Sequence, residues 1–139
     1  MEQFAEYGHT IVSLALYGLV TSLLSAATGI RKGAKNMVPG QQHLADYDDP
    51  SYRLDRAFMN AAESLPVFAT VLLAAVLAGV SPFMVNLAAS VGLVIRLVYT
   101  FCYLRKIGAA YGGLRTVLTV ISSVLLYIVV VMTVIAVFG

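Results

Sequence analysis

Polar side chains recur at regular spacing along one segment of an otherwise apolar chain. Arg53, Arg56, Asn60 and Glu63 follow one another at intervals of three, four and three residues. If the segment is helical, they share a stripe roughly 80° wide. A carboxylate such as Glu63 costs about 2.5–3.5 kcal/mol at the centre of a membrane span, so it is a functional candidate by default. Two cations, an amide and a carboxylate on one helix face indicate a binding site for a charged polar ligand.

A second stripe follows further along the chain. Arg96, Tyr99 and Tyr103 are three and four residues apart and share a face about 60° wide on a helix. Arg96 lies about 12 Å inside its span and Glu63 about 10 Å inside its own, both measured from the same side at 1.5 Å per residue. Because consecutive spans are antiparallel neighbours, we expect Glu63 and Arg96 to meet.

Two interpretations of these stripes remain open. In the first, Glu63 and Arg96 form a buried ion pair that fixes the helix register. In the second, the stripes line a polar cleft that opens at the membrane surface, which also accounts for Arg56 and Tyr99. Arginines near helix N-termini oppose the helix dipole, and an anionic ligand would relieve that conflict. Membrane topology alone is an alternative reason for arginine there, and Tyr103 is equally explained as an interfacial aromatic residue.

The composition sets the solvent in which these residues must work. The chain has 139 residues, of which 60% are hydrophobic and 12% charged, and its mean hydropathy is +0.86. These values exclude a disordered chain, a basic nucleic-acid-binding module and a soluble enzyme. The single cysteine, Cys102, excludes an intramolecular disulfide and a CxxC metal site. The chain is therefore expected to be a multi-pass integral membrane protein that binds neither nucleic acid nor metal.

Four apolar segments are long enough to span a bilayer. They predict an all-α, up-down-up-down four-helix bundle forming a single domain, 1–139, with spans at about 10–30, 57–80, 82–104 and 116–138. Lysine and arginine collect in the first connection, 31–56, and in the third, so the positive-inside rule places both in the cytoplasm and both termini on the other side. His43 and its neighbouring aspartates fit no metal-ligand spacing and are interpreted as a solvated acidic loop.

The polar residues of the second, third and fourth spans resemble those of a known family. The motif Arg53-x-x-Arg56-x-x-x-Asn60-x-x-Glu63-x-x-Pro66 on the second span is similar to the signature of the MAPEG family, the membrane-associated proteins of eicosanoid and glutathione metabolism. The resemblance covers nearly the whole chain. It extends to Arg31 after the first span, to Arg96-x-x-Tyr99-x-x-x-Tyr103 on the third and to Leu114-Arg115-Thr116 at the start of the fourth.

The resemblance implies a homotrimer with glutathione bound between subunits near the cytoplasmic side. Its implied glutathione-binding residues are Arg31 from the neighbouring subunit together with Arg53, Arg56, Asn60, Glu63, Arg96, Tyr99 and Tyr103. Arg115 is the implied catalytic residue, which stabilises the glutathione thiolate. The implied activity is transferase or peroxidase chemistry on a lipophilic small molecule that arrives from the membrane lipid, with glutathione as co-substrate.

The chain also departs from the family pattern. Ser64 stands where leukotriene synthases carry a tyrosine, Phe58 replaces a polar residue, and the stretch between Tyr103 and Arg115 is longer. These differences argue against a dedicated eicosanoid synthase and suit a bacterial inner-membrane member. Two other functions stay open: a non-catalytic member of the fold, and a small-molecule transporter, although arginines beside Glu63 would repel a cationic cargo.

Overall fold

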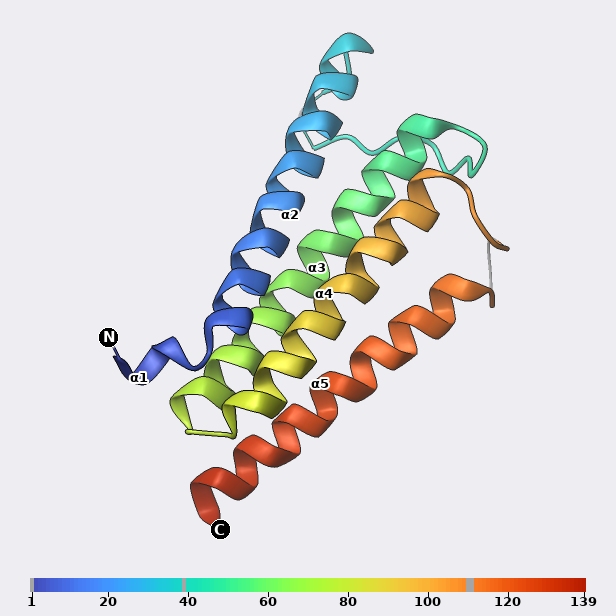
Figure 1. Cartoon of the computed structure of the whole chain (residues 1–139). Coiled ribbons are helices and arrows are strands. Elements are labelled where there is room, and N and C mark those ends of the chain that lie inside the picture. The colour runs from blue at the N-terminus through green and yellow to red at the C-terminus, as the bar shows by residue number, and fades with distance from the viewer. Residues whose placement is uncertain (1, 39, 110–111) are drawn as a thin grey trace.

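The structure, a computed structural model, describes residues 2–38, 40–109 and 112–139, and it forms a bundle of long helices (Figure 1). The helices are α1 (Glu2–Ala5), α2 (Gly8–Ala34), α3 (Pro50–Leu77), α4 (Pro82–Leu104) and α5 (Leu114–Phe138). The four long helices alternate in direction, which confirms the predicted up-down-up-down bundle. The chain begins and finishes at one end of the bundle, here called the terminal end. The opposite end, called the loop end, carries the α2–α3 and α4–α5 connections.

The distribution of apolar residues shows that lipid is the solvent. All four long helices have the length and hydropathy of membrane spans. Large apolar side chains are exposed along their outer faces, whereas most of the buried residues of α2 are hydroxylic. Small and hydroxylic residues are typical of helix–helix seams inside membranes. The chain is therefore an integral, multi-pass membrane protein.

The third helix begins earlier than hydropathy predicted. We expected the second span to start near residue 57, but α3 starts at Pro50. Asp49 caps it, because its carboxylate accepts a hydrogen bond of 2.8 Å from the backbone N–H of Ser51, and proline suits the first helical position. That N–H holds the pKa of Asp49 below its usual value. Hydropathy detects only the lipid-embedded part of a helix, so the connection is shorter than the expected 31–56.

The two central helices, α3 and α4, approach each other closely at Gly92. A Cβ atom on Gly92 would lie only 2.7 Å from the Phe68 ring. That ring is 1% exposed and meets Tyr17 of α2 edge to face, with centroids 5.6 Å apart. The Tyr17 hydroxyl in turn shares a hydrogen bond of 2.5 Å with Ser64 of α3. These contacts join α2, α3 and α4 halfway along the bundle.

The terminal end is closed by hydrogen bonds from Asn86 at the start of α4. Its side-chain oxygen accepts from both the backbone N–H and the hydroxyl of Thr10, each at 2.9 Å. Its side-chain N–H donates to the carbonyl of Glu6 at 2.7 Å. The α1–α2 junction is thereby tied to α4. Helix α5 packs on the α3–α4 pair, and a polar pocket lies among these three helices.

Candidate functional site

A polar pocket of about 300 Å³ opens at the loop end between α3, α4 and α5. It is lined by Arg56, Asn60, Tyr99, Tyr103, Ala109, Gly113, Arg115, Thr116, Thr119 and Val120. Five of these residues are among the site residues expected from the sequence. They reach one pocket because the loop-end halves of three packed helices face one another there.

Helix α3 contributes Arg56 and Asn60, which lie one turn apart on the same face. The Asn60 amide N–H donates to the Arg56 carbonyl at 2.8 Å, and the side chain, which also carries an acceptor oxygen, lines the pocket. Among the described residues, the Arg56 guanidinium makes a weak contact of 3.7 Å with the Met59 sulfur. Half-buried and without a carboxylate partner in the described part of the chain, this cation is suited to bind an anion.

Helices α4 and α5 contribute the aromatic and cationic walls. Tyr99 and Tyr103 of α4 lie with ring centroids 6.0 Å apart. Arg115 is 7% exposed, and its guanidinium lies 4.4 Å from the centroid of the Tyr103 ring. It also donates a hydrogen bond of 2.7 Å to the carbonyl of Ala109. Arg115 is therefore a buried cation held in a fixed orientation at the pocket.

Arg53 serves the connection rather than the pocket. Its guanidinium donates to the carbonyls of Tyr47 at 2.8 Å and Asp48 at 2.9 Å, and to the carbonyl of Leu104 at 3.3 Å. These bonds tie the α2–α3 connection to the end of α4. Arg31, in the last turn of α2, is exposed and does not line the pocket.

The expected meeting of Glu63 and Arg96 is wrong. In the part of the chain that the structure describes, no ion pair joins them. Glu63 is exposed, whereas Arg96 is half-buried and its Nε atom has no hydrogen-bond partner among the described residues. The next residue, Ser64, lies about 100° further round α3 and contacts Tyr17 and the deeper helix interface instead, while Glu63 remains on the exposed edge of the stripe.

Arg96 lines a second pocket of about 390 Å³, which lies deeper in the same three helices. Each of the three helices supplies it with a polar residue that lies about one turn deeper in the bundle than a residue of the first pocket. On α3 Ser64 lies below Asn60, on α4 Arg96 lies below Tyr99, and on α5 Ser123 lies below Thr119. The remaining lining residues are Val67, Val71, Leu126, Tyr127 and Val130. A polar pocket at the loop end thus stands above a mostly apolar one within the membrane span.

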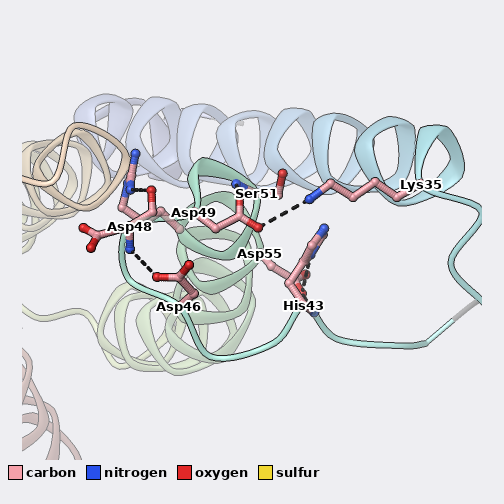
Figure 2. A network of polar contacts seen from close by, with 8 residues as sticks. Lys35, His43, Asp46, Asp48, Asp49, Ser51 and Asp55 are labelled. Atoms are coloured by element: carbon pink, nitrogen blue, oxygen red, sulfur yellow. Dashed lines mark hydrogen bonds and ion pairs between the residues drawn. The ribbon is translucent and has the colours of Figure 1, made fainter.

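The α2–α3 connection contains polar contacts that sequence reasoning missed (Figure 2). His43, expected on a solvated loop, is buried, and its backbone N–H donates to the Asp55 carboxylate at 3.2 Å. Lys32 pairs with the same carboxylate at 2.8 Å. Asp46 and Asp48 are exposed, as expected, and the described residues contain no cluster that could hold a metal. Nothing in the periodicity of a loop signals which of its residues become buried.

The fold and the two pockets define a multi-pass membrane protein with a polar site at one membrane surface. The family model of the MAPEG family matches residues 10–135, and the chain belongs to this family. A comparison with curated proteins gives no match. The family includes glutathione transferases as well as non-catalytic members.

Proposed function

We propose that the protein is a glutathione-dependent membrane transferase or peroxidase that acts on lipophilic electrophiles. The observation that carries this proposal is the convergence of Arg56, Asn60, Tyr99, Tyr103 and Arg115 on one pocket at the loop end. Glutathione is a tripeptide with two carboxylates, an amine, two amides and a thiol. Arg56 matches a carboxylate, and the Asn60 side chain matches the amide groups. Membership of the MAPEG family supports the same assignment.

In this proposal Arg115 activates the thiol. A free thiol of this type has a pKa of about 8.5, and only the thiolate is a good nucleophile. A guanidinium beside the sulfur favours the charged form and so lowers the pKa of the thiol. The thiolate then attacks the electrophilic carbon, a sulfur–carbon bond forms, and the leaving group departs with its electron pair. The thiol proton passes to water.

The deeper pocket supports a lipophilic second substrate. Half of its lining residues are aliphatic, and it lies within the membrane span about one turn below the polar pocket. A substrate dissolved in the bilayer can reach it laterally and meet a thiol bound above it. Holding the two reactants side by side converts a bimolecular encounter into an effectively unimolecular step.

We further propose that the active form is a homotrimer in the bacterial inner membrane, with the loop end cytoplasmic. On a single chain Glu63 and Arg31 are exposed and away from the polar pocket, which suits residues that complete a site across a subunit boundary. Lys32, Lys35 and Lys106 lie at the loop end, in agreement with the positive-inside rule. Native mass spectrometry of the detergent-purified protein tests the trimer, and a monomer at every concentration contradicts it.

A conjugation assay tests the proposed activity. Purified protein, glutathione and chlorodinitrobenzene are mixed, and formation of the thioether is followed by absorbance. Arg115→Leu should lower the rate about a hundredfold, the cost of one lost donor to a developing anion. Arg105→Leu is the matched control, because Arg105 is exposed at the end of α4 and lies outside both pockets. A wild-type protein that binds glutathione but gives no turnover with any electrophile belongs with the non-catalytic members.

A further inference from the structure

The α2–α3 connection brings an aromatic ring onto Arg115. The Arg115 guanidinium carbon lies 4.8 Å from the centroid of the Tyr47 ring and 4.4 Å from that of Tyr103. The two rings meet edge to face, with centroids 5.9 Å apart and planes at 86°. Arg115 therefore contacts one ring from its own site and a second ring from a distant segment. These three residues are called the arginine clamp.

Tyr47 is itself held at its backbone. Arg53 of α3 donates to the Tyr47 carbonyl at 2.8 Å and, through Nε, to the Leu104 carbonyl at the end of α4. Asp48, the next residue, forms an ion pair with Lys106 beyond α4. The segment that carries Tyr47 is thus tied to α3 and to the α4–α5 connection at the same level as the pocket.

A second anchor lies a few residues earlier in the same connection. The Asp55 carboxylate is 3% exposed and is satisfied by Lys32 of α2 at 2.8 Å and by the backbone N–H of His43 at 3.2 Å. A buried carboxylate is costly unless it is paired, so these partners are held firmly. With anchors at His43 and at Tyr47, residues 43–48 form a strap across the loop ends of α2, α3 and α4. Figure 2 shows the part of this strap around His43.

We propose that Tyr47 is a positioning residue for Arg115. Its ring, fixed by the strap, restrains the long arginine side chain so that the guanidinium stays at the polar pocket. Attraction between a cation and a ring face is strongest where water is excluded, and Arg115 is buried. This inference deepens the proposed function and rests on it, since it assigns the strap the task of holding the thiol-activating group.

The ring of Tyr47, rather than its hydroxyl, performs this task. The hydroxyl is buried and has no hydrogen-bond partner in the described part of the chain. Leaving a buried polar group unpaired costs free energy, so removing this hydroxyl should be harmless. Tyr47→Phe is therefore expected to keep the clamp, and Tyr47→Leu to lose it. This contrast separates ring contact from hydrogen bonding.

The first test uses the ionisation of bound glutathione. The ultraviolet absorbance of the thiolate is titrated against pH in the full-length protein, and kcat and KM are measured with chlorodinitrobenzene. Tyr47→Leu should move the ionisation to higher pH and lower kcat at neutral pH by roughly twofold to thirtyfold, the range expected for a lost cation–ring contact. KM should change less. Tyr47→Phe should match the wild type, and Tyr52→Leu on the first turn of α3 controls for losing a tyrosine nearby.

A purely structural role predicts a different pattern. Tyr47→Leu would then lower the unfolding temperature and the yield of active protein, while the pH of thiol ionisation in the folded fraction stayed unchanged. That result overturns the inference. Where Tyr47→Leu yields no folded protein, Tyr47→Met, which also lacks a ring, takes its place.

A second test does not depend on glutathione. Phenylglyoxal modifies accessible arginines, and mass spectrometry maps which ones react and how fast. Arg115 should react slowly in the wild type and in Tyr47→Phe, and at least twofold faster in Tyr47→Leu, with exposed Arg105 as the internal reference. An unchanged Arg115 rate in Tyr47→Leu overturns the clamp. If Arg115 is modified as expected but the protein does not ionise glutathione, the arginine clamp is supported and the proposed function is refuted.

Discussion

Replacing Gly92 by alanine should disturb the α3–α4 contact that holds the two walls of the polar pocket together. The added Cβ would lie 2.7 Å from Cε2 of Phe68, whereas ordinary carbon contacts are at about 3.5–4.0 Å. The Phe68 ring or the α4 backbone must therefore move by about 1 Å. The ring has little room to turn, because it is buried against Tyr17. Overpacking of this kind typically costs 1–3 kcal/mol, and alanine recovers about 1 kcal/mol of helix propensity over glycine, so we expect about 1 kcal/mol of net destabilisation.

The assay is thermal unfolding of the detergent-purified variants, with Gly29→Ala as the matched control. Gly29 is also helical, but a Cβ there meets nothing within 4 Å. Alanine favours a helix over glycine by about 1 kcal/mol, so the control should be neutral or slightly stabilised. Because α3 and α4 carry Asn60 and Tyr99, we also expect Gly92→Ala to weaken glutathione binding. Equal stability of the two variants would refute the close approach of α4 to Phe68 at Gly92.

Two further predictions concern the ends of the bundle. Asn86→Leu should lower the free energy of unfolding by about 1–3 kcal/mol, because it leaves the Thr10 donors and the Glu6 carbonyl without their partner. Unfolding measurements check this prediction, with Ser81→Ala, at an exposed position near the start of α4, as the control. Asp49→Ala should lower the unfolding temperature by removing the α3 cap, whereas Asp49→Asn should preserve it. Since the pKa of Asp49 is lowered on folding, its carboxylate stabilises the fold above about pH 4, and this contribution is lost as the pH falls further. Unfolding curves of wild type and Asp49→Asn across this pH range should diverge; parallel curves would contradict the assignment.

The membrane bundle and half of the site were predictable because they depend on helix periodicity. Arg56 and Asn60, like Tyr99 and Tyr103, repeat at helical spacing, and helices this apolar have few ways to pack in lipid. Such reasoning fixes which residues share a helix face. It fixes how that face is turned toward a neighbour only to within tens of degrees, and for this reason Glu63 and Arg96 were expected to meet and do not.

The contributions of the connection were not predictable in this way. Tyr47 and His43 lie in a segment without helical or strand periodicity, so their packing depends on long-range partners such as Arg115 and Asp55. The same holds for Arg53, which belongs to the polar stripe by spacing but bonds to carbonyls of the connection. Loop residues acquire their roles from the scaffold that surrounds them, which periodicity does not describe.

Thermal unfolding with and without glutathione tests the central claim most directly. A ligand at a hundred times its Kd stabilises a protein by about 2.7 kcal/mol, which gives a clear upward shift of Tm. We expect this shift in the wild type and in Arg105→Ala, and we expect it to be lost in Arg56→Ala, whose Tm without ligand should stay close to that of the wild type. No shift in the wild type at millimolar glutathione would contradict the assignment of the loop-end pocket to this thiol.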